Sequence, residues 1–135
     1  MTLAISAAHA NARLQGTMAF ADAGVQTARI RLYATARPAT GGDPLAAPLV
    51  EITLAKPCGA IDAGVLTLVQ ADAGGDLILE TGTALWARWV NGDEMHVADG
   101  SVSDAAGDGD FKVSGTAGTL LYAGARALLG TSTLS

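Results

Sequence analysis

The feature that most constrains the fold of this chain is a change in hydrophobic period near residue 24. Before it, residues 5–23 are rich in Ala and place Leu14 and Met18 four positions apart, as on one face of a helix. After it, short runs alternate apolar and polar side chains, with Gly, Pro, Asn and Asp between them. No second helical pattern separates these runs, which argues against βαβ units. The sequence therefore predicts an all-β fold with one N-terminal α-helix.

The helix is predicted over residues 5–24, with signals for both of its ends. Ser6 is a suitable N-cap residue, and Gly24 is a natural residue at which a helix stops. Gly16 lowers the helix propensity of the middle by about 1 kcal/mol relative to Ala.

The alternating runs predict about eight short strands. In the clearest one, Ile30 and Leu32 point to one side, and Arg29, Arg31 and Tyr33 point to the other. That run spans residues 28–34, and the other predicted strands are 49–54, 65–69, 77–80, 83–90, 95–99, 111–113 and 125–134. The stretch 119–122 could pair before the last of them.

The predicted turns follow the usual chemistry of Gly, Pro, Asn and Asp. Residues 37–44 form a loop, Pro57 and Gly59 end a strand, and Asn91-Gly92 between two strands is a strong hairpin signal. Such spacing is typical of a small β-sandwich, or of a jelly-roll or barrel-like domain, over residues 28–135. With the helix it makes one domain, residues 1–135.

Charge and hydropathy argue against several classes of function. The net charge is −5 and the eight basic residues are scattered, so we expect neither nucleic-acid binding nor attachment to an anionic membrane. The sequence holds no apolar run long enough to span a membrane. No basic residue precedes Arg13, so we expect no signal peptide and synthesis in the cytosol.

Residues that could support catalysis or bind metal are few. His9, His96 and Cys58 lie far apart and form no metal-ligand or nucleophile motif, so we expect no enzyme activity and no cofactor. The acidic loop 99–110 has carboxylates suited to Ca²⁺, but its spacing matches no EF-hand, and a solvated turn is the simpler interpretation. Cys58 is the only cysteine; we expect it to lie in a turn as a small, buried, reduced residue.

The residues best suited to bind a partner are aromatic or basic. Trp86 and Trp89 lie three apart, hence on opposite faces of a strand, so one is expected in the core and the other at a rim or a partner surface. If the strands adjoin, Trp86 and Arg88 lie beside the face made by Arg29, Arg31 and Tyr33, and Trp, Tyr and Arg are favoured at interfaces. The alternatives are that both tryptophans pack in the core, or that one stacks against a sugar.

Several stretches occur in an order that is familiar from one group of proteins. An Ala-rich helix at 5–24 is followed by IRLYATARPA, LVEITLAKPCG, ALWARWVNGD, HVADGSV and a Thr/Ser-rich end, GTSTL. In this order the chain resembles a widespread group of small β-rich proteins of tailed bacteriophages and prophages. That group shows LKIYTGTQPA, LLATLTLSDPAFG, GWFRLVDSDG and AVIDGSVG at the corresponding places. This sequence departs from the pattern at Lys56 and Cys58, and in a less regular last strand.

The resemblance implies a non-enzymatic structural protein of the virion. It would bind other virion proteins, the major capsid or tail proteins, as a homo-oligomer on the particle. Capsid decoration is the first expectation, and a tail or baseplate accessory is the second. The alternative function from a different class is a carbohydrate-binding or adhesion module, which would need an exposed tryptophan.

Overall fold

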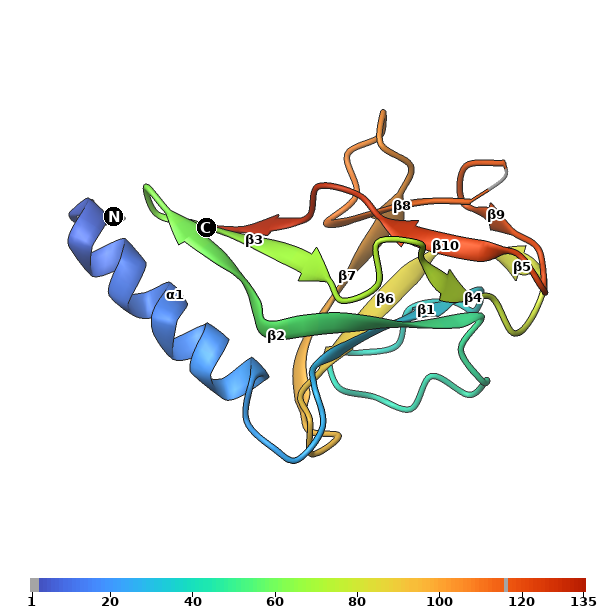
Figure 1. Ribbon diagram of the computed structural model, residues 1–135, viewed down its shortest axis with the longest axis horizontal. Coiled ribbons are helices and arrows are strands. Elements are labelled where there is room, and N and C mark those ends of the chain that lie inside the picture. Colours follow the sequence, from blue (N-terminus) through green and yellow to red (C-terminus); the bar gives the residue numbers. More distant parts are fainter. Residues whose placement is uncertain (1–2, 116) are drawn as a thin grey trace.

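The computed structural model describes residues 3–115 and 117–135, which form one helix and a set of short strands (Figure 1). The helix α1 spans Ala7–Ala21. The strands are β1 (Arg29–Tyr33), β2 (Val50–Asp62), β3 (Val65–Gln70), β4 (Asp76–Leu77), β5 (Gly82–Thr83), β6 (Trp86–Val90), β7 (His96–Ser103), β8 (Phe111–Ser114), β9 (Leu120–Leu121), β10 (Arg126–Leu129) and β11 (Thr133–Leu134).

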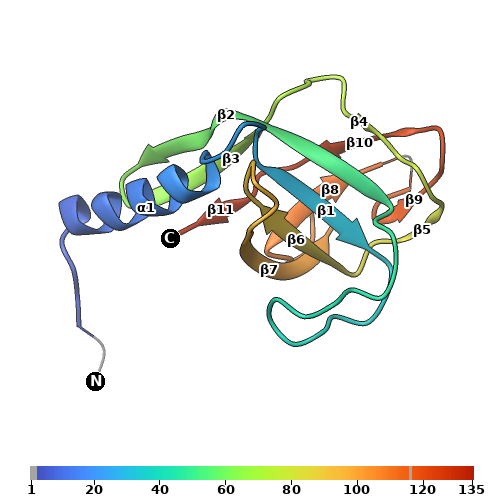
Figure 2. The same cartoon turned by 90° about the horizontal axis from the view of Figure 1, so that it is seen from below.

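The strands confirm the predicted all-β fold with one N-terminal helix, in its barrel-like form. A nine-stranded sheet has the order β11-β3-β2-β1-β6-β7-β8-β10-β4 and curls into a half-barrel. The strands β5 and β9 form a separate two-stranded sheet. Figures 1 and 2 show α1 lying along one end of the body, beside β2 and β3.

The core lies on the concave side of the half-barrel. On β1 the alternation predicted from sequence holds, and Ile30 and Leu32 are fully buried. Their neighbours on β2, Val50 and Ile52, are buried directly beside them in register. Burying side chains of this size stabilises the fold by about 1.5–3 kcal/mol each, so the centre of the sheet is the most strongly held part.

The helix begins where the sequence predicted. The side chain of Ser6 accepts a hydrogen bond from the His9 N–H at 3.1 Å, which caps the first turn. Leu14 is buried and Met18 packs partly against the core, so they do share the inward face.

The helix ends earlier than predicted, at Ala21, with Asp22 as the C-cap residue. Two contacts with other elements hold the residues that follow the last turn. The Asp22 carboxylate accepts a hydrogen bond from the Cys58 N–H at 2.9 Å, and the Ala23 carbonyl accepts one from the Gly92 N–H at 3.0 Å.

The Asn91-Gly92 signal correctly predicts a hairpin. A glycine in such a turn is expected to adopt a positive φ, but Gly92 is needed for a different reason. The strands β6 and β7 pair antiparallel, and residues 91–95 connect them. The positive φ in this connection belongs to Glu94, at 66°. Gly92 instead allows close approach, because a Cβ on it would lie 2.7 Å from the Gln26 carbonyl carbon and 2.9 Å from the Ala23 carbonyl oxygen.

The prediction that Pro57 and Gly59 end a strand is wrong, because β2 continues to Asp62. The pairing of β2 with β3 shifts between Leu54 and Gly59, so the chain bulges there and then rejoins β3. A hairpin that the sequence analysis missed follows, with positive φ at Ala63 (49°) and Gly64 (78°).

Two of the predicted strands are divided in the structure. The segment 83–90 divides between β5 and β6, and 125–134 divides between β10 and β11. The segment 119–122 contains β9, which pairs with β5. The strands β7 and β8 pair in parallel, at Val102 with Phe111 and Ser103 with Lys112. Gly and the polar residues of the 104–110 loop let the chain return over this short distance.

Side chains complete the wall of the half-barrel where its strands do not pair. The Gln70 amide at the end of β3 donates to the Ala127 carbonyl at 3.1 Å and accepts from the Leu129 N–H at 2.8 Å. Ser132, which is buried, accepts a hydrogen bond from the Lys112 N–H at 3.0 Å. These links join segments that are far apart in the chain, and no local pattern of residues indicates them. The sequence therefore did not predict them.

Candidate functional site

The five residues singled out from the sequence do come together on the convex side of the sheet. The strands β1 and β6 are antiparallel neighbours, with Arg31 opposite Arg88 and Tyr33 opposite Trp86. Arg29 lies two residues before Arg31 on the same side of β1. Their proximity, which the sequence left conditional on the two strands adjoining, is therefore a feature of the fold.

The aromatic part of this face is stacked and covered. The rings of Tyr33 and Trp86 lie 4.6 Å apart with an angle of 18° between their planes, and the Arg88 guanidinium sits 5.2 Å from the Trp86 ring centre. The Trp86 Nε1 donates to the Thr35 hydroxyl at 3.4 Å. Only 1% of Trp86 and 4% of Tyr33 is exposed. The expectation of one core and one rim tryptophan is wrong: Trp89 is 2% exposed, so both pack inside the chain.

The charged part of the face is a row of ion pairs across four strands. Arg31 on β1 lies opposite Glu51 on β2, and its Nε is 2.7 Å from a Glu51 carboxylate oxygen. Arg88 on β6 lies opposite Asp99 on β7, with its Nε 2.8 Å from that carboxylate. Like charges opposite each other destabilise a sheet. Arg31 and Arg88 face each other, but each pairs with its own carboxylate, which offsets their repulsion.

Glu94 adds a second carboxylate, which was not among the site residues singled out from the sequence. It comes from the hairpin after β6 and pairs with both Arg29 and Arg31. Arg29 also lies 3.1 Å from Glu51. The outward position of Glu51 follows from the alternation of its strand. The Asn91-Gly92 signal predicts the hairpin that carries Glu94, but nothing in the sequence indicates that this hairpin places Glu94 over β1. We call Arg29, Arg31, Glu51, Arg88, Glu94 and Asp99 the charged ladder.

Asp99 is the most strongly constrained member of the charged ladder. Its side chain is buried, and it accepts hydrogen bonds from Arg88 and, at 3.0 Å, from the Gly41 N–H of the 34–49 loop. His96 Nε2 lies 3.0 Å from it without the alignment of a hydrogen bond. Burial alone would raise the pKa of Asp99, but the bonds from Arg88 and Gly41 outweigh burial and lower the pKa to about 2.

The lowered pKa predicts acid sensitivity. A depressed carboxylate pKa contributes stability that is present above the unfolded value of about 3.9 and is lost as the pH falls to the folded value. We expect the free energy of unfolding, measured with urea, to fall as the pH is lowered from about 4 to about 2. Asp99 should account for about 2 kcal/mol of this decrease. Asp99→Asn should be less stable than the parent at pH 7 and nearly equal to it at pH 2. A constant difference across this range would contradict the assignment.

The remaining sequence candidates do not form a reactive centre. The acidic loop splits into separate roles: Asp104 accepts from the Ala106 N–H, and Asp110 accepts from the N–H and hydroxyl of Ser101. Within residues 3–115 and 117–135, no three His, Cys, Asp or Glu side chains gather as metal ligands. In the same residues no helix is long and apolar enough to cross a membrane.

Cys58 lies inside β2 at its bulge, not in a turn as expected, but it is a small buried residue as predicted. Its side chain has no solvent exposure, and burial raises the pKa of its thiol to about 12, with the nearby Asp22 acting in the same direction. The thiolate is the reactive form, so the folded protein offers almost none of it.

We therefore expect Cys58 to react with a thiol-specific reagent only as fast as the protein unfolds. Labelling should be slow in native buffer and rapid in urea, and non-reducing gels should show monomer only. Rapid labelling of the folded protein would place the thiol at the surface instead.

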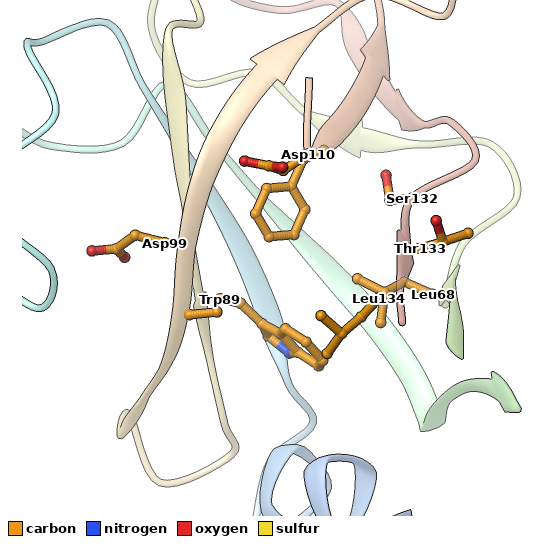
Figure 3. Close-up of a pocket in the computed structure, with 9 residues that line it drawn as sticks. Leu68, Trp89, Asp99, Asp110, Ser132, Thr133 and Leu134 are labelled. Carbon is orange, nitrogen blue, oxygen red and sulfur yellow. The ribbon is translucent and has the colours of Figure 1, made fainter. Parts of the chain in front are cut away.

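A hollow of about 230 Å³ opens on the concave side, between β7 and β11 (Figure 3). The Asp99 carboxylate points away from it, toward the charged ladder. The inner lining is largely apolar, and Ser132, Thr133 and Asp110 add polar groups. The apolar lining residues are Leu68, Trp89, Ala98, Phe111 and Leu134.

Comparison with known proteins gives no relative for this chain. No protein-family model matches it, no curated protein matches it, and no solved structure matches its fold.

Proposed function

We propose that this chain is a non-enzymatic structural component of a tailed-phage or phage-like particle. It would bind a symmetric lattice of other virion proteins, as capsid decoration in the first place and as a tail or baseplate accessory in the second. The proposal starts from the resemblance of the ordered stretches to small phage and prophage proteins. What supports it beyond the sequence is a surface suited to binding protein.

That surface is an exposed apolar patch at the β4 end of the nine-stranded sheet. Leu77 and Leu79 flank the buried Ile78, so both point to solvent, and Leu128 is exposed beside the buried Ala127. The strands β4 and β10 that carry Leu77 and Leu128 are paired, and β4 is the last strand of the nine. Exposed apolar side chains that gather on one surface are a common sign of a protein–protein contact. We call Leu77, Leu79 and Leu128 the edge patch; it is the observation that carries the proposal.

The charged ladder has a second role in the proposal. Its six charges are paired within the chain, so the strands β2, β1, β6 and β7 are tied across their convex side. A stiff sheet loses little conformational freedom on binding. Attachment through Arg29, Arg31, Tyr33, Trp86 and Arg88 themselves stays a prediction, and the part-exposed Arg31 is the residue that tests it.

The experiment compares particles made with and without the gene, by negative-stain electron microscopy and by gel analysis of the purified particles. We expect the protein on parent particles, and altered stability or shape of particles that lack it. Leu77→Asp with Leu79→Asp should lower occupancy. Arg31→Ala should stay folded, because Arg29 still pairs with Glu51 and Glu94, so a loss of occupancy would assign attachment to the charged ladder. Identical particles, with the protein absent from the parent, would reject the proposal.

The carbohydrate-binding alternative lacks the platform it needs. It requires the ring of Trp86 or Trp89 to be exposed for stacking on a sugar, and both rings are buried. A glycan array with no bound sugar is the expected result for the folded domain.

A further inference from the structure

Within the described residues, the half-barrel has a gap in its wall bounded by two strand edges that pair with no strand across it. The β7 edge is partly occupied by side chains, because the Ser101 N–H donates to Asp110 and the Asp99 carbonyl accepts from Arg37. β8 pairs with β7 only at Val102 and Ser103, so within the described residues the stretch 96–101 of β7 pairs with β6 alone. On the other side, β11 is the end strand of the sheet and pairs only with β3. The 230 Å³ hollow lies between these two edges, as Figure 3 shows. We call this gap the slot.

The slot suits an extended segment that carries apolar side chains. Unpaired strand edges offer main-chain donors and acceptors to an added strand. The neighbouring hollow, lined by Trp89, Phe111 and Leu134, offers space for every second side chain of such a strand.

The chain itself carries a segment of this kind. Residues 3–6 precede α1 and are not helical, and Figure 2 shows them running away from the body. Leu3 is 82% exposed and Ile5 is 39% exposed, so this arm buries little of its apolar surface in its own chain. Leu3 and Ile5 are two residues apart, which places both on the same side of an extended strand. We call residues 3–6 the arm.

We propose that the arm of one copy inserts into the slot of a second copy, adding a strand to the free edge of β7 and placing Leu3 and Ile5 against Trp89 and Phe111. Each copy has one arm and one slot, so the exchange joins copies either reciprocally or into a ring. The inference concerns the protein alone and does not depend on a particle.

The first test measures mass in solution by sedimentation and light scattering. We expect the parent to be a multiple of the 13.5 kDa chain, and Leu3→Asp with Ile5→Asp to be a monomer with unchanged circular dichroism. Val25→Asp with Leu45→Asp is the matched control, because both residues are highly exposed and lie outside the arm; it should keep the parent mass. A monomeric parent, or an arm variant that keeps the parent mass, would overturn the proposal.

The second test locates the contact. Chains with Ile5→Cys are mixed with chains carrying Ala98→Cys, whose side chain lines the slot, and the mixture is oxidised. We expect a disulfide-linked dimer from this mixture and none from Val25→Cys mixed with Ala98→Cys. The native Cys58 is fully buried and does not compete. Equal cross-linking from both mixtures, or none from either, would show that the slot does not receive the arm.

Discussion

Replacing Trp86 with Ala should destabilise the domain by about 3–5 kcal/mol, the range expected for removing a buried Trp. Trp86 is fully buried, its ring stacks on Tyr33, and its indole donates to Thr35. The Arg88 guanidinium would also lose the ring it now covers. Since small domains have a total stability of about 5–15 kcal/mol, the variant should unfold at a far lower urea concentration than the parent.

Leu85→Ala is the matched control for this experiment. Leu85 precedes Trp86 in the chain and its side chain is half exposed, so its removal should change stability by no more than about 0.5 kcal/mol. Urea unfolding followed by circular dichroism measures both. Similar losses from the two variants would mean that the Tyr33–Trp86 stack does not stabilise this end of the sheet.

Gly92→Ala should destabilise the domain by about 3 kcal/mol, the upper end of the usual range for overpacking. The added methyl group would lie within 3.0 Å of backbone atoms of both Gln26 and Ala23. Backbone atoms cannot move aside as a flexible side chain does, so the segment that joins α1 to β1 must separate from the β6–β7 hairpin. The hydrogen bond from the Gly92 N–H to the Ala23 carbonyl would be lost with it.

Gly16→Ala is the control that separates a steric effect from a general effect of replacing glycine. A Cβ on Gly16 meets nothing within 4 Å, and the residue lies inside α1. Ala there should stabilise the helix by about 0.5–1 kcal/mol. If both substitutions shift the unfolding midpoint in the same direction, the close contact at Gly92 is not what holds the helix to the sheet.

The sequence predicts those parts of the fold that depend on local patterns. Ser6 identifies the start of the helix, and the alternation around Ile30 and Leu32 identifies β1 and its buried side. The close approach at Gly92 and the bulge before Gly59 were not predicted, because each depends on backbone from a distant segment. An Asn-Gly pair looks the same in a sequence whether a turn or a neighbouring chain requires the glycine.

The candidate site likewise combines features that local patterns predict with features that depend on distant segments. The outward positions of Arg29, Arg31 and Tyr33 follow from the strand period, and their proximity to Trp86 and Arg88 follows once β1 and β6 pair. Burial of both tryptophans was one of the alternatives, but the loop contacts at Trp86 could not be predicted, because they depend on Thr35 and Gly41 of the loop after β1. Glu94 was missed for a related reason, since only the folded hairpin carries it over β1.

These observations change which surface of the chain is best suited to a lattice. The predicted face of Arg, Tyr and Trp residues is largely occupied by contacts within the chain, whereas the edge patch exposes its leucine side chains and the slot opens onto a largely apolar hollow. Attachment to a particle is therefore expected to depend more on Leu77 and Leu79 than on Arg31.

Particles purified on a density gradient from cells that carry the gene provide the most direct test of the proposed function. Quantitative mass spectrometry of the particle fraction measures the number of copies of this chain relative to the major capsid or tail protein. The account predicts that the chain sediments with the particles at a fixed, high copy ratio that persists after a second gradient. Its absence from the particles, with all of it remaining in the soluble fraction, would contradict a structural role in the virion.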